Sequence, residues 1–211
     1  GLNPYMEIDT EGLPIMTDEV EHEMKKMHKG KAVGPDDIPI ELIIALEELG
    51  IQEVTNLLNI IYDTGEIPDD FKKSVFIALP KKPGTTECEQ HRTISLMSHL
   101  TKLLLRVLMS RMRNKIRPEI SDTQFGFVAD KGTRNAIFAL YMLMERSLEV
   151  QKDLYFCFID YSKAFDKVRH DDLFDMLSEL NIDAKDMRIL RNLYWQQMTA
   201  IRIDNELSEY R

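Results

Sequence analysis

A six-residue apolar run, Leu154 to Ile159, ends at a carboxylate, Asp160, and this pattern constrains the 211-residue chain more than any other. So short a run, rich in aromatic residues, is typical of a strand buried on both faces rather than of a helix. An acid at the end of such a strand is held rigidly with its oxygens facing a cleft, as a Mg²⁺ ligand requires. For Asp160 taken alone, a turn former or helix cap is the more common role.

Composition permits a real core but gives no sign of a membrane or secreted protein. With 44% hydrophobic residues, the chain can form one large domain or two small ones. It has no apolar run of membrane-spanning length and no signal peptide, so no membrane partner is expected. Cys88 and Cys157 are too far apart in sequence to indicate a disulfide framework or a zinc site. We therefore expect an intracellular protein, nuclear or cytoplasmic, and because the chain begins with Gly1, an excised or incomplete piece.

Charge is distributed unevenly along the chain. The net charge of −9 divides into −13 over residues 1–70, +7 over residues 71–150 and −3 over residues 151–211. A net negative charge argues against a nucleic-acid partner, but the basic block in the middle is the kind of local footprint that such a partner needs. A solvated helix face would give the same counts, so charge alone decides nothing.

Periodicity and turn residues predict the other elements. Helices are expected over residues 17–29, 40–49, 54–62 and 98–117, then after Thr133, after Asp171 or Asp172, and after Asp183. Strands are expected over residues 74–80 and around 93–96, joined as a hairpin, and over 200–203 with a turn at Asp204 and Asn205.

Two of these helices carry the clearest apolar stripes. The stripe of helix 98–117 predicts a core face and comprises Leu100, Leu103, Leu104, Val107, Leu108, Met112 and Ile116. Basic residues lie largely off that stripe, at Lys102, Arg106, Arg113 and Arg117, where they can follow a phosphate backbone. The helix after Thr133 is expected to bury Ala136, Ile137, Leu140, Leu143, Met144 and Leu148.

Five segments, in order along the chain, resemble one family. FIDYSKAFDKVRH, which contains Asp160, resembles the first catalytic motif of reverse transcriptases from non-long-terminal-repeat (LINE-type, RTE-like) retrotransposons. The segments before it are similar to that family's fingers and early palm: KAVGPDDIPIELI, FIALPKKPG, HRTISLMSHLTKLLLRVLMSRM and QFGFVADKGTRNAI. The resemblance covers nearly all of residues 16–211, and five ordered motifs are far more specific than one.

The resemblance implies an α+β fold, the helix-rich fingers and palm of a right-hand polymerase with an incomplete palm sheet. The implied organisation is an N-terminal extension over residues 1–16, fingers with early palm helices over 17–150, and the first part of the palm over 151–211. The family's second acidic motif, Tyr-x-Asp-Asp, does not occur in the sequence. We therefore expect this piece to be inactive by itself.

Roles for the Asp160 segment follow from the same resemblance. Asp160 is implied to be catalytic and to bind two Mg²⁺ (or Mn²⁺) ions in the intact enzyme, with the carbonyl of Tyr161 completing one of them. The backbone at Lys163 and Ala164 is implied to hold an incoming deoxynucleoside triphosphate. Phe165 stands where the family places the ring that excludes a ribose 2′-hydroxyl, although core packing is a common role for phenylalanine.

Cations before the acidic motif are implied to bind the other substrates, an RNA template and a DNA primer. In the predicted hairpin, Lys82 and Arg92 are expected to contact the triphosphate, with a solvated turn as the alternative. Lys31 lies in the Gly-Pro loop, residues 31–39, and is expected either to contact a template phosphate or to have only a structural role in that loop. Arg106 and Arg113 are expected to bind nucleic acid through the basic helix face.

Further positions depart from the family pattern or have an open role. Val128 stands where the family usually has an arginine, so Lys131 or Arg134 is expected to replace that template contact. Asp166 is expected to be structural rather than a metal ligand.

Two other classes of function remain open at this point. A non-catalytic nucleic-acid-binding or scaffold domain, derived from a reverse transcriptase, would keep the fold without the activity. An acidic helical module for protein contacts would explain the −13 over residues 1–70 but not the five motifs. A polymerase also implies a further partner, the downstream palm and thumb of the same polyprotein.

Overall fold

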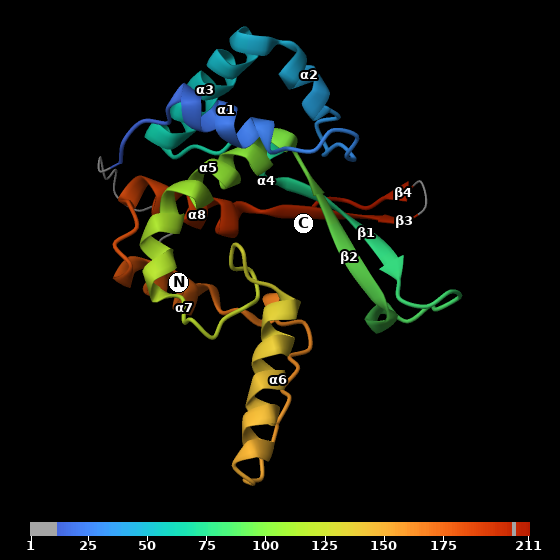
Figure 1. Cartoon of the computed structure of the whole chain (residues 1–211). Helices are drawn as coiled ribbons and strands as arrows, with labels where there is room; N and C mark the ends of the chain where they lie inside the picture. Colours follow the sequence, from blue (N-terminus) through green and yellow to red (C-terminus); the bar gives the residue numbers. More distant parts are fainter. Residues whose placement is uncertain (1–11, 204–205) are drawn as a thin grey trace.

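The structure is a computed structural model that describes residues 12–203 and 206–211, and its class is α+β, as predicted (Figure 1). Its helices are α1 (Thr17–Lys25), α2 (Ile40–Ala45), α3 (Glu47–Thr64), α4 (Asp69–Lys72), α5 (His99–Ile116), α6 (Thr133–Glu149), α7 (His170–Glu179) and α8 (Ala184–Gln196). Its strands are β1 (Lys73–Pro80), β2 (His91–Met97), β3 (Met198–Ile203) and β4 (Glu206–Leu207). None of the helices in this described part is both long and apolar enough to cross a bilayer.

The four strands form one mixed sheet in the order β2-β1-β3-β4. The predicted hairpin of β1 and β2 is confirmed, with Ile77 opposite Ile94 in an antiparallel register. The start of a second hairpin is confirmed by β3 and β4, although the predicted turn residues Asp204 and Asn205 lie outside the described residues. The sequence gives no hint that β3 joins β1 in parallel, with the buried Val75 opposite the buried Ala200.

Helix α5 lies at the centre of the core. Its predicted apolar stripe is confirmed, since Leu103, Leu104, Val107 and Leu108 are completely buried. Around it pack α1, α3 and α8, which contribute residues such as Val20, Leu58 and Ile189. Side chains from positions 15 to 193 thus share one hydrophobic cluster. Burial of this apolar surface is the main term that stabilises the fold.

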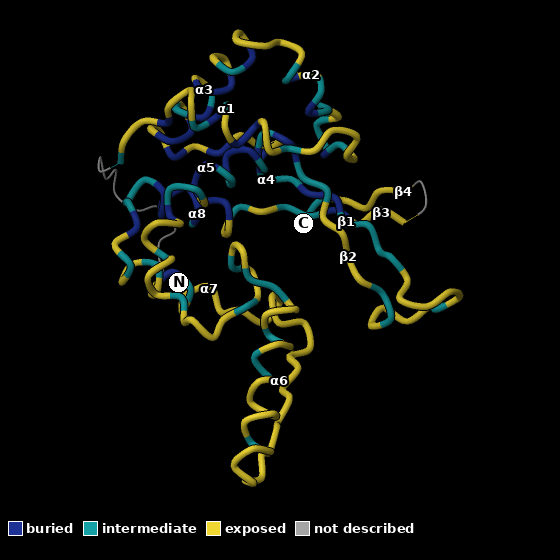
Figure 2. Tube along the Cα trace, viewed as in Figure 1, coloured by how far each residue is buried: buried dark blue, intermediate teal, exposed yellow. Residues whose placement is uncertain are grey.

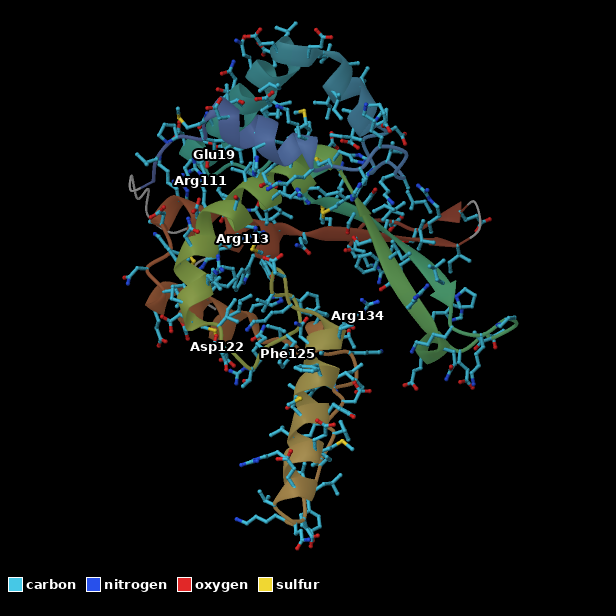
Figure 3. The ribbon with its side chains drawn as sticks, viewed as in Figure 1. Glu19, Arg111, Arg113, Asp122, Phe125 and Arg134 are labelled. Atoms are coloured by element: carbon cyan, nitrogen blue, oxygen red, sulfur yellow. The ribbon has the colours of Figure 1, made fainter. Side chains whose placement is uncertain are left out.

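A polar network fixes the segment before α1 and the helix α1 itself to α5. Figure 3 labels the two side chains at its centre, Glu19 on α1 and Arg111 on α5. Arg111 Nη2 lies 2.6 Å from Glu19 Oε2, and the guanidinium also donates to the carbonyls of Leu13 and Pro14, at 2.7 Å each. Burial raises the pKa of Glu19, but hydrogen bonds from Arg111 and from the Met16 N–H lower it by more, so its net pKa lies below the ordinary value.

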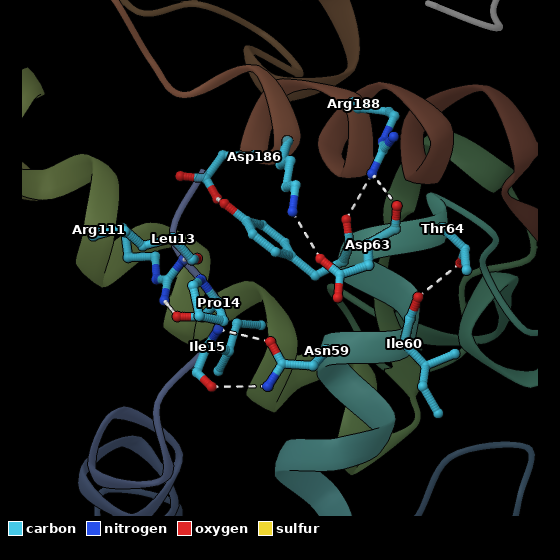
Figure 4. Close-up of polar contacts among 12 residues, drawn as sticks. Leu13, Pro14, Ile15, Asn59, Ile60, Asp63, Thr64, Arg111, Asp186 and Arg188 are labelled. Atoms are coloured by element: carbon cyan, nitrogen blue, oxygen red, sulfur yellow. Dashed lines mark hydrogen bonds and ion pairs between the residues drawn. The ribbon is translucent and has the colours of Figure 1, made fainter. Parts of the chain in front are cut away.

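A second set of polar contacts joins α8 to α3 (Figure 4). The buried Tyr62 hydroxyl donates to Asp186 Oδ1 at 2.8 Å, and burial raises the pKa of both groups. Arg188 donates to the carbonyl oxygens of Tyr62 and Asp63 near the end of α3, where three or four carbonyls lack helical partners. Asn192 donates to the carbonyl of Gly65 at 2.8 Å. Arg188 and Asn192 thus supply hydrogen bonds to carbonyls at and just after the end of α3.

Two sequence predictions about burial are wrong. Residues 154–160 do not form a buried strand: they are exposed and form no β-ladder with the described strands. Helix α6 forms where predicted, but it contains no buried residue and extends away from the rest of the molecule (Figures 1 and 2). Its expected core residues include Ile137, 60% exposed, and Leu148, 78% exposed. An apolar stripe becomes core only where a second element packs on it, and no described element does so here.

Candidate nucleotide and metal site

The β1–β2 hairpin presents the two cations that were expected to contact a triphosphate. Arg92 lies in β2 opposite Leu79, one residue pair from the connecting loop, and Lys82 lies in that loop. Both are exposed. A hydrogen bond of 2.7 Å from the Lys81 N–H to the Gln90 carbonyl closes the base of the loop. The sheet therefore holds Arg92 on a paired strand and leaves Lys82 on a solvated turn.

The Asp160 segment runs beside α6 as an extended chain (Figure 1). Asp160 and Tyr161 are exposed, and Lys163 adopts a left-handed backbone conformation with φ of 52°. A short 3₁₀ helix, Phe165–Lys167, follows. Phe165 is 78% exposed, so core packing does not account for it here. Its ring makes an edge-to-face contact with Phe127, at 5.9 Å between centroids, which joins two of the motifs singled out in the sequence.

These residues do not complete a metal site. Mg²⁺ takes six oxygen ligands in near-octahedral geometry, usually including several waters and more than one carboxylate. Within residues 12–203 and 206–211, no group of three or more His, Cys, Asp or Glu side chains is arranged to hold a metal ion. The Asp160 carboxylate and the Tyr161 carbonyl can offer three oxygens, and among the described residues Asp160 belongs to no group of three or more such side chains.

The five cations expected to contact nucleic acid occupy different environments. Arg106 is not a free basic group, because its Nε donates to the buried Glu23 at 3.1 Å and so joins α5 to α1. Lys131 donates to the Asp122 carbonyl at 2.8 Å and lies over the Phe125 ring. Lys31, Arg113 and Arg134 are exposed, the last two on α5 and α6 (Figure 3).

Comparison with known proteins decides the family. A family model described as reverse transcriptase (RNA-dependent DNA polymerase) matches residues 79–211, which include the hairpin cations and the Asp160 segment. This chain belongs to the reverse transcriptase family. The predicted resemblance of this chain to LINE-type reverse transcriptases is confirmed, because the relatives of the chain come from transposons and other mobile elements.

Three relatives show how much of a reverse transcriptase polypeptide the chain represents. It is 29% identical over 203 residues to a probable RNA-directed DNA polymerase from transposon BS of Drosophila melanogaster, covering 92% of the chain and 22% of the relative. It is 25% identical to a retrovirus-related Pol polyprotein from the type-1 retrotransposable element R2 of Nasonia vitripennis, and this match covers 90% of the chain and 18% of the relative. It is 26% identical to the RNA-directed DNA polymerase from mobile element jockey of D. melanogaster, and this match covers 74% of the chain and 17% of the relative. The chain spans about a fifth of the length of these relatives.

The structure separates two basic residues of α5 that look equivalent in sequence. Replacing Arg113 by glutamate is expected to weaken RNA binding without unfolding the chain, because Arg113 is exposed and forms no ion pair with another described residue. Replacing Arg106 by glutamate is expected to destabilise the fold, since it places a second carboxylate against the buried Glu23. Thermal unfolding and RNA titration of both variants check this. Equal melting temperatures for the two would contradict the structural role of Arg106.

Proposed function

We propose that this chain forms the fingers, over residues 17–150, and the first part of the palm, over 151–211, of an RNA-directed DNA polymerase of a LINE-type retrotransposon. The observation that carries the proposal is the family match over residues 79–211, because that range contains both Arg92 on its strand and the Asp160 motif. Relatives described as RNA-directed DNA polymerases favour an enzyme over a scaffold domain.

In the proposed reaction, a primer 3′-hydroxyl attacks the α-phosphate of a deoxynucleoside triphosphate opposite an RNA template, and pyrophosphate leaves. Such transfers depend on positioning and charge stabilisation more than on covalent chemistry by the protein. Lys82 and Arg92 neutralise the triphosphate from the hairpin side, and the backbone at Lys163 and Ala164 orients it. Reverse transcriptases generally use divalent metals, and Asp160 with the Tyr161 carbonyl contributes part of the ligand set for Mg²⁺ or Mn²⁺.

Primer extension tests the proposal directly. The 211-residue chain alone is expected to give background extension on an RNA template, because the described residues form no group of three or more metal-ligating side chains, and two metal ions need several carboxylates. The same chain continued by a palm and thumb from its own gene is expected to extend the primer. Extension by the chain alone, lost on replacing Asp160 by asparagine, would overturn the claim that the site is incomplete. No extension by the continued chain would overturn the proposed activity.

Replacing Phe165 by alanine in the continued chain is expected to raise the use of ribonucleotides. The ring is 78% exposed and contacts Phe127 by its edge, so it is available to block a 2′-hydroxyl. The measurement is single-nucleotide incorporation, deoxy against ribo, for the variant and for wild type. Phe158→Ala is a suitable control, since Phe158 is 81% exposed in the same segment but precedes Asp160. Unchanged sugar selectivity would remove Phe165 from the site.

A further inference from the structure

The stretch of residues 32–71 contains ten aspartates and glutamates and no lysine, arginine or histidine, so its net charge is −10. It includes α2 and α3 and accounts for most of the −13 found over residues 1–70. The proposed polymerase role uses none of these carboxylates. In Figure 1, α2 and α3 lie at the end of the molecule opposite to α6, away from the Asp160 segment that runs beside α6. This charge therefore needs an explanation of its own.

Little of the charge is neutralised within the chain. Ion pairs join lysines to three of the ten carboxylates, those of Asp63, Asp69 and Asp70. The remaining seven form no ion pair with any described residue. Two of these, Glu47 and Glu48, are exposed in the first turn of α3, where they stabilise the positive end of the helix dipole. That role leaves both carboxylates open to a cation from outside.

The same two glutamates line a groove of about 440 Å³ between the N-terminal turns of α1 and α3. Asp18 and Glu21 line it from α1, and Ile51 adds an apolar side chain. Of these four carboxylates only that of Glu21 has an ion pair with a described residue, a lysine of its own helix. The groove therefore combines a wall of unpaired negative charge with an apolar contact, which suits the aliphatic stem and charged head of a lysine or arginine.

Three exposed leucines lie next to the groove in sequence. Leu42, Leu46 and Leu49 are 56%, 51% and 59% exposed, and their i, i+4, i+7 spacing is that of one helix face. The core does not need them, because the opposite side of α2 already buries Ile40 and Ile43. Covering these leucines would remove apolar surface from water and so favour association with a partner.

The junction of α2 and α3 holds the leucines and the carboxylates together. A Cβ placed on Gly50 would lie 2.7 Å from both the Ile43 carbonyl oxygen and the Leu46 Cβ, so the end of α2 packs closely against the first turn of α3. The backbone changes direction at Glu47, which has a left-handed φ of 51°. Leucines and glutamates thus alternate over one short, tightly packed corner. We call this corner the acidic leucine face, and it comprises Leu42, Leu46, Glu47, Glu48 and Leu49.

We infer that the acidic leucine face binds a basic amphipathic helix of another protein. The lysines or arginines of that helix reach Glu47 and Glu48, and its apolar side covers the three leucines. Amphipathic helices commonly dock on apolar surfaces in this way. Charge complementarity selects the class of partner, because a region of net charge −10 repels nucleic acids and anionic lipids and attracts cationic segments. The inference goes beyond the proposed polymerase activity and uses no residue assigned to it.

A second copy of the chain is a poorer partner than a different protein. The two long helices of the basic block over residues 71–150 are α5 and α6, and each lacks one of the two required features. Helix α5 is basic, but its apolar stripe is buried in the core. Helix α6 exposes its apolar stripe, but its two arginines are balanced by two glutamates. A partner that offers exposed leucines and positive charge on one helix must therefore come from elsewhere.

Binding of a synthetic peptide to the 211-residue chain, followed by fluorescence anisotropy, tests the inference. The probe is a labelled peptide of about 18 residues, made of leucine and lysine at the spacing of an amphipathic helix. It is expected to bind at about 50 mM salt and to bind more weakly as salt screens the carboxylates. A peptide with glutamate in place of every lysine is expected not to bind, because it meets the face with like charge.

Two pairs of substitutions separate the charged contacts from the apolar ones. Glu47→Gln with Glu48→Gln is expected to weaken peptide binding about fivefold and to reduce its salt dependence. Leu42→Ser with Leu49→Ser is expected to weaken binding about tenfold at every salt concentration, since it removes apolar area and no charge. The leucine pair also keeps the test valid if loss of the first-turn glutamates destabilises α3, because neither leucine belongs to the buried core.

Matched controls come from α6, which has exposed residues of the same types. Glu145→Gln with Glu149→Gln, and Leu143→Ser with Leu148→Ser, are each expected to change affinity less than about twofold. A loss from the α6 leucine pair equal to that from Leu42 and Leu49 variants would show that the peptide binds the α6 stripe, and would overturn the inference.

Three further results would overturn the inference. The first is no binding of the lysine peptide at about 50 mM salt, or equal binding of the glutamate peptide. The second is self-association of the chain, measured by sedimentation, that Leu42→Ser with Leu49→Ser abolishes, because the face would then belong to a second copy. The third is loss of peptide binding when the chain is continued by its own palm and thumb, which would assign the face to the same polypeptide. Primer extension by the continued chain tests the proposed function separately.

Discussion

Asp160→Asn in the polymerase formed by this chain and its downstream palm is expected to lower nucleotide incorporation by about 10³-fold or more, a loss of roughly 4 kcal/mol in transition-state stabilisation. Asparagine keeps the shape of the side chain but removes the charge that a divalent cation requires. The structure leaves Asp160 exposed at the end of an apolar run, so no buried partner depends on its carboxylate. Single-turnover incorporation of one deoxynucleotide, with binding measured separately, is the assay.

Asp166→Asn provides the matched control for that experiment. Asp166 lies six residues further, in the 3₁₀ helix Phe165–Lys167, and it too is exposed. The same chemical change there is expected to reduce incorporation less than about tenfold, because a structural carboxylate on a surface turn contributes little. Equal damage from the two variants would mean that Asp160 is not the distinctive metal ligand. An Asp160→Asn enzyme that melts well below wild type would assign the residue a structural role instead.

Elements whose partners lie close in sequence could be predicted from the sequence. The β1–β2 hairpin is of this kind, since a single loop, residues 81–90, joins two runs of strand composition and the strands pair with each other. The stripe of α5 also became core as predicted. Helices α1 and α2 ended before their predicted limits, at Lys25 and Ala45. At the second boundary, Glu47 has a left-handed φ of 51° where α2 gives way to α3.

Elements that need a distant partner could not be predicted in the same way. The run Leu154–Ile159 has a strand's composition, but a strand forms only where a neighbour accepts its backbone hydrogen bonds, and in the described sheet β3 takes the place beside β1. The prediction that the apolar stripe of α6 is buried was wrong for the same reason. Periodicity shows which face of a helix is apolar, but it does not show which element packs on that face.

The site residues named from the sequence stay predictions, and their arrangement in space could not be predicted from the sequence. Arg106 and Arg113 are one heptad apart, and only the packing of α1 on α5 shows that the first is committed to Glu23. Likewise, Lys31, His99 and Lys102 line one pocket only because the loop after α1 lies beside the start of α5. No spacing rule contains that information, because the two segments are separated by about a third of the chain.

Arg111→Ala is expected to cost about 3 kcal/mol of folding free energy, or about 6–12 °C in melting temperature. The guanidinium is 14% exposed and donates to Glu19 and to the Leu13 and Pro14 carbonyls. Alanine removes these charge-assisted bonds together, leaves a half-buried carboxylate unpaired, and ends the cation–π contact with Tyr62, at 5.4 Å. Chemical denaturation of wild type and variant at neutral pH measures the difference.

Two controls separate this network from ordinary surface pairing. Lys25→Ala breaks a pair of the same 2.6 Å length, to Glu21, but its side chain is 70% exposed, so a cost below about 0.5 kcal/mol is expected. Lowering the pH is the second: the pKa of Glu19 is depressed in the fold, so its stabilisation is complete above the ordinary value of 4.5 and is lost as pH falls through the folded pKa. The penalty of Arg111→Ala should therefore shrink in acid. A penalty independent of pH would assign the effect to the two carbonyl contacts and to packing against Tyr62 rather than to the ion pair.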